Sequence, residues 1–452
     1  MSDNQKTCIE TLWLKNFRCF EDLELNLHPE LTVLVAANGQ GKSSILEAIH
    51  IVLSPFFRPY AQERSVGFGG EDIRQVRFPN SMEHQFPVEV SAQGQIVGKS
   101  LKWQRFLRTI KSHTTVKEAF PLIHLSEELK KRVEGNKPVV LPMFANYGSQ
   151  RLWQEKRSQQ RILLKNLDES RFAGYQYTWQ PDSSSIYFFS WFLYSVRVNE
   201  RFLLELFKRG MLGNHSDGLA ASEQSPYNGE LNQIRKAIDK CLELTGWNNL
   251  EFTPDDELIL HHEKHGALKL NQLSDGIRIV ALLAGDLAYR AVRLNPHLGD
   301  KILEETPGIV MIDEIEQHLH PAWQQIIIPS LRELFPKVQF IITTHSPQVL
   351  SAVPAESIRI LDDQRVYRPE IGTQGAEASR ILQRVFEVEN RPPKERHAKN
   401  LKEYADLVFR DKWESPRAIE LREELDLAFG DDEPELQRLD LFIRNRKWEL
   451  ES

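Results

Sequence analysis

The chain has 452 residues, of which 41% are hydrophobic and 27% charged, a composition typical of folded globular proteins and not of disordered or fibrous ones. The formal net charge of -7 argues against a surface that is basic throughout, so any contact with nucleic acid requires a local basic patch. Three scattered cysteines are too few for a disulfide framework, and no apolar run is long enough to span a membrane, so we expect a cytoplasmic protein.

The first predicted elements are strands. Residues 9–14 and 23–27 alternate apolar and polar side chains, as half-buried strands do, whereas residues 31–37 are almost continuously apolar and indicate a strand buried on both faces. Further strands are predicted in two ranges, 87–107 as an antiparallel pair and 139–145 as a buried strand.

The second half of the chain alternates between helical and strand patterns. Residues 151–250 are predicted to be a helical insertion with a loose loop at 210–229, where Gly, Ser and Asn are frequent. Two β-branched runs at 309–312 and 338–343 flank a helical stretch, which is the β-α-β pattern of a parallel sheet. Residues 369–452 return to helical spacing and are predicted to form a helical tail.

A glycine-rich motif lies between the first apolar strand and a helix. Residues 36–43 (AANGQGKS) have the P-loop pattern, in which Gly39 and Gly41 let backbone N–H groups face a phosphate at the N-terminus of the helix. Lys42 is expected to reach the β- and γ-phosphates, and the Ser43 hydroxyl to bind magnesium. The nucleotide contacts predicted in this motif are Asn38, Gly39, Gly41, Lys42, Ser43 and Ser44.

Position 36 departs from the strict pattern, because Ala36 stands where a P-loop begins with glycine. An ordinary glycine turn that caps a helix is the alternative interpretation. The strand before the motif and the helix after it favour the P-loop.

A second apolar strand, at residues 309–312, ends in two carboxylates. This is the pattern of a Walker B element, in which Asp313 holds magnesium and Glu314 polarises the attacking water as general base. A strand that ends in a solvated acidic turn is the alternative, and the P-loop upstream favours the catalytic interpretation.

Residues 273–278 (LSDGIR), between these motifs, open a predicted helix. With them the sequence resembles the ATP-binding-cassette superfamily, in which an L-S-x-G element at a helix N-terminus contacts the γ-phosphate bound by the other protomer. The resemblance implies that Ser274 and Gly276 bind ATP across a head-to-tail dimer. Taken by itself, Ser274 is equally well explained as a helix N-cap.

Three further positions take their roles from this resemblance. His345, directly after a buried strand, corresponds to the family's switch histidine, a catalytic group that senses the γ-phosphate. Residues 316–321 correspond to the D-loop at the dimer interface, and an incomplete zinc site that uses their two histidines is the alternative. Gln150 is the candidate for the Q-loop contact with magnesium.

Residues 14–20 (LKNFRCF) and 313–316 (DEIE) make the chain similar to the RecF, OLD and structural-maintenance-of-chromosomes branch of the superfamily. The resemblance implies an α/β fold: an ABC ATPase head with a mixed sheet around a parallel P-loop core, a helical insertion that forms a lateral arm, and a helical C-terminal tail. OLD-type proteins add a Toprim nuclease domain, and its Asp-x-Asp pair is not found in this sequence, so no nuclease centre is predicted.

The tail resembles, at residues 381–386 and 431–436, the stand-alone ATPases of Septu-type anti-phage systems, which act with a separate HNH-type nuclease. A partner effector is therefore expected. Two basic runs leave DNA binding open, and solvated strand and helix faces are their alternative explanation. The first run contains Lys99, Lys102, Arg105, Arg108 and Lys111, and the second contains Arg151, Lys156, Arg157, Arg161 and Lys165.

These motifs predict an ATPase that binds ATP and Mg²⁺, hydrolyses ATP as a dimer or higher oligomer, and regulates a partner nuclease in anti-phage defence. Two alternatives stay open: a RecF-like repair ATPase that acts directly on DNA, and a nucleotide-sensing scaffold with little turnover. The predicted domains are an N-terminal ATPase lobe (1–150), a lateral helical arm (151–250), a C-terminal ATPase lobe (251–368) and a helical tail (369–452).

Overall fold

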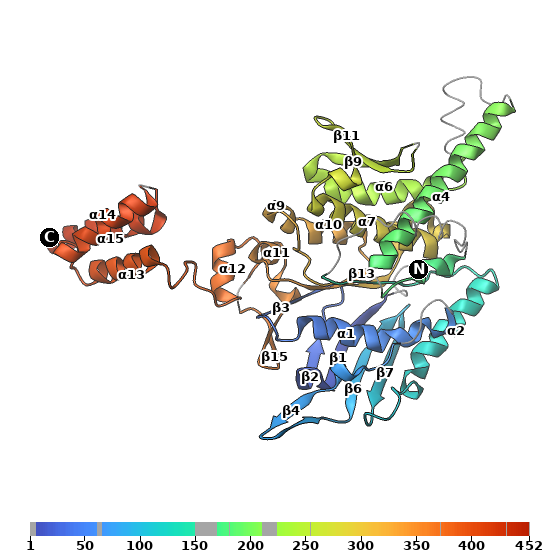
Figure 1. Ribbon diagram of the computed structural model, residues 1–452, viewed down its shortest axis with the longest axis horizontal. Coiled ribbons are helices and arrows are strands. Elements are labelled where there is room, and N and C mark those ends of the chain that lie inside the picture. The colour runs from blue at the N-terminus through green and yellow to red at the C-terminus, as the bar shows by residue number, and fades with distance from the viewer. Residues whose placement is uncertain are drawn as a thin grey trace. The chain divides into compact units, whose positions relative to one another are not determined.

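The computed structural model describes residues 6–60, 66–149, 170–179, 181–209, 224–253, 255–370, 372–430 and 432–451 (Figure 1). The chain forms two compact units, Met1–Ala378 and Ser379–Ser452. No helix within the described ranges is both long and apolar enough to cross a lipid bilayer. The sequence predictions that lie outside these ranges are Gln150, the second basic run and most of the loop at 210–229.

The central sheet of the first unit has six strands, β3 (Leu31–Ala36), β8 (Met143–Tyr147), β12 (Gly308–Ile312), β13 (Val338–Thr343), β14 (Ile358–Asp362) and β15 (Arg365–Tyr367). Their order is β15-β14-β3-β13-β12-β8, and all neighbours run parallel except β14 and β15. Every residue of β3, β12 and β13 is buried, as in a sheet with both faces covered. The predicted mixed sheet with a parallel core is therefore confirmed.

A second, antiparallel sheet in this unit has four strands, β1 (Cys8–Phe17), β2 (Phe20–Asn26), β6 (Val88–Ile96) and β7 (Lys99–Leu107). Their order is β2-β1-β6-β7, so the strands predicted at 9–14, at 23–27 and within 87–107 are confirmed. A separate hairpin consists of β4 (Gln75–Phe78) and β5 (Ser81–His84).

Helix α1 (Lys42–Leu53) packs between the two sheets, against β3 and β13 on one side and β6 and β7 on the other. Helices α6 (Asn228–Leu242) and α7 (Asp275–Leu294) pack together on the opposite face of the central sheet (Figure 1). The other helices of this unit are α2 (Phe120–Glu134), α4 (Pro181–Lys208), α8 (Ile302–Glu305), α9 (Pro321–Gln324), α10 (Ile327–Leu334) and α11 (Pro347–Ser351).

A three-stranded sheet that was not predicted precedes α7, and its strands are β9 (Trp247–Phe252), β10 (Leu258–His262) and β11 (Gly266–Lys269). Asparagines and histidines interrupt its apolar alternation, which is the signal on which strand prediction depends. Helices α4 and α6 carry the helical pattern that was predicted between residues 151 and 250.

The strand predicted at 139–145 lies further along the chain, as β8. Leu141 is bound to a side chain and not to a neighbouring strand: its N–H donates to Asn295 Oδ1 at 2.8 Å, and its C=O accepts from Asn295 Nδ2 at 3.0 Å. Pro142 has no N–H to donate to a strand ladder. The predicted start of this strand was therefore wrong.

The first basic run is not a uniform cationic surface. Arg105 is 2% exposed, and its guanidinium donates to the Thr115 carbonyl at 3.1 Å and to the Ser54 hydroxyl at 2.9 Å. Burial lowers the pKa of Arg105 to about 10. Lys99 forms a surface ion pair with Glu128 at 2.6 Å. Arg105 therefore contributes to neither a phosphate-binding surface nor a solvated face, because its side chain is buried and hydrogen-bonded inside the protein.

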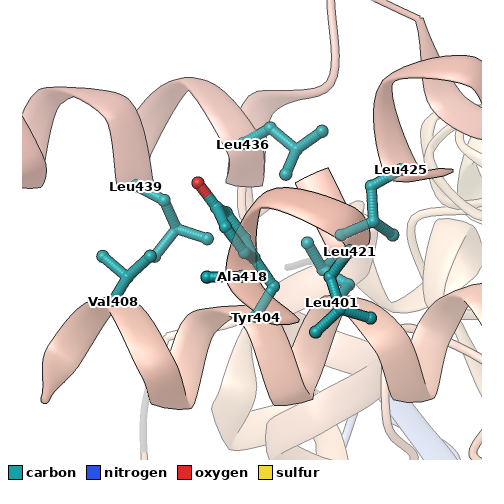
Figure 2. Packing of buried hydrophobic residues seen from close by; sticks show 8 residues of the cluster. All are labelled: Leu401, Tyr404, Val408, Ala418, Leu421, Leu425, Leu436 and Leu439. Carbon is teal, nitrogen blue, oxygen red and sulfur yellow. The ribbon is translucent and has the colours of Figure 1, made fainter. Parts of the chain in front are cut away.

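The second unit contains a small helical module made of α13 (Arg396–Phe409), α14 (Pro416–Phe429) and α15 (Pro434–Glu451), which α12 (Ala378–Arg384) precedes along the chain. This confirms the predicted helical tail. The core of the module contains eight buried side chains from the three helices (Figure 2), namely Leu401, Tyr404, Val408, Ala418, Leu421, Leu425, Leu436 and Leu439.

Candidate functional site

The loop between β3 and α1 has the backbone geometry of a phosphate site. Gly39 and Gly41 have φ angles of 83° and 94°, which belong to the left-handed region. Helix α1 begins directly after Gly41, and no side chain caps its first turn. The first N–H groups of the helix are therefore left for an anion, and Asn38 and Ser43 are exposed beside them.

Gly41 cannot be replaced without a clash. A Cβ built on it would lie 2.5 Å from Cζ of Phe20 and 2.6 Å from Sγ of Cys19. Burial raises the pKa of the Cys19 thiol, and the neighbouring Ser44 side chain acts in the opposite direction. The turn between β1 and β2 thus packs against the P-loop. This contact explains physically why the motif at residues 14–20 occurs together with the P-loop.

Ala36 is the last residue of β3 and is 4% exposed. It pairs with Leu361 of β14 in the parallel ladder, so its backbone is extended. Alanine adopts this conformation without strain, because only a positive φ requires glycine. The departure from the glycine pattern therefore leaves the loop geometry intact.

Lys42, in the P-loop, is a buried cation that interacts electrostatically with the acidic end of β12. It is 7% exposed, and its Nζ donates to the carbonyl oxygen of Ala36 at 3.0 Å. Burial lowers the pKa of this ammonium, whereas the carboxylates of Asp313, Glu314 and Glu316 act in the opposite direction. Three acidic side chains thus favour the charged form of this buried ammonium.

Hydrogen bonds bring Ser43, Asp313 and Thr343 together from three elements. Ser43 Oγ donates to Oδ2 of Asp313 at 2.9 Å, and Thr343 Oγ1 donates to Oδ1 at 2.5 Å. The N–H of Asp313 donates to the carbonyl of Tyr147 at the end of β8 at 2.8 Å. Hydroxyl and carboxylate oxygens are the ligands that magnesium prefers. The side chains of Ser43 and Asp313 therefore fit a magnesium ion.

Glu314 has a φ of 46°, which is uncommon for a residue other than glycine and typical of functional sites. Its N–H donates to Thr343 Oγ1 at 2.8 Å, so this threonine holds both acidic residues. The sequence predictions did not include Thr343. The available signal was a hydroxyl side chain at the carboxyl end of an apolar strand.

Ser274 and Gly276 lie at the start of α7. Ser274 is exposed, and its hydroxyl makes no capping hydrogen bond, so the N-cap alternative gains no support. A Cβ built on Gly276 would lie 2.7 Å from the carbonyl oxygen of His318 and 3.2 Å from Cζ3 of Trp323. The signature turn therefore packs closely against the D-loop segment of its own chain.

His345 is half-buried between β13 and α11, and its N–H donates to Oε1 of Glu316 at 2.6 Å. The two histidines of the D-loop segment have different surroundings. His320 Nδ1 accepts the N–H of Ala322 at 3.3 Å and caps α9, and His318 is exposed. The ring of His320 is thus explained as a helix cap.

A buried charged network links β8 to α7. Tyr147 Oη donates to Oδ2 of Asp286 at 2.6 Å, and Arg290 Nε donates to the same atom at 2.9 Å. Asp286 is 1% and Arg290 2% exposed, and Arg290 also donates to the carbonyl of Gly174 at 3.0 Å. Because Tyr147 also accepts the N–H of Asp313, the network fixes α7 relative to the acidic site. It was not predicted, although an acid and a base four residues apart within the mostly apolar stretch 279–292 are visible in the sequence.

The P-loop lies between β3 and α1, the two acids end β12, the signature turn opens α7, and His345 follows β13. This arrangement of motifs on a mixed sheet defines an ATP-binding-cassette-type ATPase of the RecF, OLD and SMC-like branch. The family model described as "AAA domain, putative AbiEii toxin, Type IV TA system" matches residues 31–351. The chain belongs to this family.

Relatives of the chain include two retron proteins and a Septu protein. It is 39% identical over 206 residues to "Retron Ec83 probable ATPase" of Escherichia coli, a match that covers 46% of this chain and only 38% of that relative. It is 26% identical over 400 residues to "Retron Vc95 probable ATPase" of Vibrio cholerae serotype O1 biovar El Tor, covering 80% and 74% of the two chains. It is 40% identical over 93 residues to "Septu protein PtuA" of Bacillus mycoides (strain KBAB4), covering 21% and 12%. The predicted resemblance to Septu ATPases is confirmed.

Proposed function

We propose that the chain hydrolyses ATP to ADP and phosphate with magnesium, as one half of a head-to-tail dimer. Each ATP would lie between the P-loop of one protomer and the signature turn of the other. The observation that carries this proposal is the hydrogen-bonded set of Ser43, Asp313 and Thr343, which holds oxygen donors at the base of the P-loop.

Within one protomer, Ser43 and Asp313 would hold the magnesium ion, with Gln150 as a further contact. When bound, the ion supplies positive charge to the phosphate oxygens. Lys42 binds the β- and γ-phosphates, and Glu314 accepts a proton from the attacking water as general base. The hydrogen bond from Ser43, the neighbour of Lys42, to Asp313 supports this division of roles.

Three residues complete the site around the γ-phosphate. His345 donates a hydrogen bond to it from the same protomer. Ser274 and Gly276 contact it from the other protomer, through the hydroxyl and the N-terminal N–H groups of α7. The exposed Ser274, whose hydroxyl makes no capping hydrogen bond, supports this assignment.

The ATP-dependent change in the dimer would regulate a separate effector, a nuclease in cytoplasmic anti-phage defence. Similarity to retron and Septu proteins supports this part of the proposal. The compact helical module within Ser379–Ser452 is the segment proposed to engage the effector.

The test begins with Glu314→Gln, which removes the proposed base and keeps the shape of the side chain. We expect ATP turnover to fall by roughly 100-fold or more while ATP still binds. The variant should accumulate as an ATP-bound dimer in light scattering, whereas Lys42→Ala should lose ATP binding. Wild-type protein that releases no phosphate would contradict hydrolysis, and a protein that stays monomeric with ATP would contradict the dimer.

The effector is tested by purification of the tagged protein from its native host with ATP, followed by quantitative mass spectrometry. A stoichiometric second protein with nuclease activity is the expected result. A protein that purifies without a companion and binds duplex DNA directly would instead favour a repair ATPase.

A further inference from the structure

The chain between β13 and α11 is irregular, and His345 lies in the middle of it. The N–H of Thr344 donates to Leu34 of β3 at 3.2 Å, and the N–H of Ser346 donates to Oγ1 of Thr344 at 3.0 Å. The N–H of His345 donates instead to the Glu316 carboxylate, at 2.6 Å. The backbone of His345 is therefore held by a side chain from another loop.

The Glu316 carboxylate binds two neighbouring residues at once. Its Oε1 accepts from His345, and its Oε2 accepts the hydroxyl of Thr344 at 2.7 Å. The backbone next to Glu316 is also held in place, because the N–H of Ile315 donates to the carbonyl of Thr343 at 3.1 Å. Hydrogen bonds to a carboxylate are short and strong, so the two that Glu316 accepts restrict the loop more than hydrogen bonds between neutral groups would.

A second tie holds the residue that follows the histidine. Ser346 Oγ donates to Oε1 of Gln324 at 2.6 Å, and Nε2 of Gln324 donates to the carbonyl of Leu319 at 2.8 Å. The same hydroxyl accepts the N–H of Val349 at 3.2 Å in the first turn of α11. The backbone of His345 is thus held on both sides by the segment that follows the two catalytic acids.

We infer that Glu316 is a positioning residue for His345 and thereby sets how well the site distinguishes ATP from ADP. The inference rests on the proposed contact between His345 and the γ-phosphate. A hydrogen bond from an imidazole requires a donor–acceptor distance of about 2.7–3.2 Å, and a misplacement of about 1 Å breaks it. Without the two hydrogen bonds to Glu316, the loop would allow the imidazole of His345 a wider range of positions.

The experiment measures the affinities of ADP and of a non-hydrolysable ATP analogue, each with magnesium, by calorimetry. The variants are Glu316→Ala, His345→Ala and the double variant, with the exposed Glu333→Ala as a matched control. For Glu316→Ala we expect the analogue to bind roughly tenfold more weakly while ADP affinity changes less than about twofold, because a hydrogen bond to the γ-phosphate is lost. Glu316→Gln should recover part of this loss, since its amide oxygen still accepts the N–H of His345.

The double variant decides whether Glu316 acts through the histidine. If it does, His345→Ala alone and His345→Ala with Glu316→Ala should bind the analogue equally, because the second change has nothing left to position. Additive losses, or equal weakening of ADP and the analogue, would overturn the inference, as would a wild-type protein that binds both nucleotides equally. This readout requires no turnover, so a protein that fails to hydrolyse ATP would refute hydrolysis and leave the positioning test intact.

Discussion

The carboxyl end of the central sheet and the C-terminal helical module hold their side chains by opposite means. At the sheet, charged groups such as Asp313 and Arg290 are buried, and each is bound by several short hydrogen bonds. In the module, apolar side chains fill the core (Figure 2). Charged groups such as Arg422 lie near its surface. A buried charge depends on its partners, whereas a solvated ion pair contributes little. Hydrogen bonds therefore fix the positions of the side chains at the end of the sheet. The apolar core stabilises the module, so its surface residues can be substituted at little cost.

The largest effect is expected for Arg290→Met. This change leaves Asp286 buried without its ion-pair partner, which destabilises the first unit by about 3–5 kcal/mol. Hydrogen exchange of the α7 amides measures it, because α7 carries both residues. Exchange rates in α7 that stay at the wild-type level would show that the buried pair is not what fixes this helix.

A somewhat smaller effect is expected for Leu421→Ala in the module. Leu421 is 0% exposed, and its truncation leaves a cavity that costs about 2–5 kcal/mol. Faster hydrogen exchange should be confined to the helices of the module, with ATP affinity unchanged. Weaker ATP binding would mean that the stability of the module is coupled to ATP binding by the first unit.

Gly276→Ala should act on function more than on stability. The added methyl group would meet the carbonyl of His318, and relief of this clash costs about 1–3 kcal/mol and displaces the signature turn. ATP turnover should fall about tenfold. The matched control is Gly229→Ala, at a first-turn position of α6 where an added Cβ meets no atom within 4 Å, and it should leave turnover at the wild-type rate.

The smallest effect is expected for Arg422→Met, which removes ion pairs with Asp426 and Asp440. These groups are partly solvated, so the loss should be about 1 kcal/mol in hydrogen exchange of α14. A loss of stability as large as that expected for Arg290→Met would show that the ion pairs of the module contribute as much as the buried pair of the first unit.

The strands that position the site were predictable because their signal is local. Strands β3, β12 and β13 are short apolar runs, and burial on both faces of a parallel sheet requires such runs. The P-loop was predictable for a similar reason, since positive φ at Gly39 and Gly41 limits the residue choice to glycine almost regardless of the rest of the fold.

The partners of charged residues were not predictable, because they are set by segments far away in the sequence. Arg105 lies on the buried face of β7 with Trp103, but its partner Ser54 is 51 positions away, and Lys102 on the opposite face lies over the ring of Trp13. The Tyr147 and Asp286 contact joins residues 139 positions apart. Composition and periodicity contain no information about such a pairing.

The extended backbone at Ala36 has a consequence for how such chains are found. Alanine narrows the conformations open to the unfolded chain, so at a position that does not need positive φ it stabilises the folded state by about 0.4–1 kcal/mol relative to glycine. A search pattern that demands glycine at the first position of the loop would pass over this chain. The sign of φ at Gly39 and Gly41, and not the letter at position 36, is what a reliable search criterion should encode.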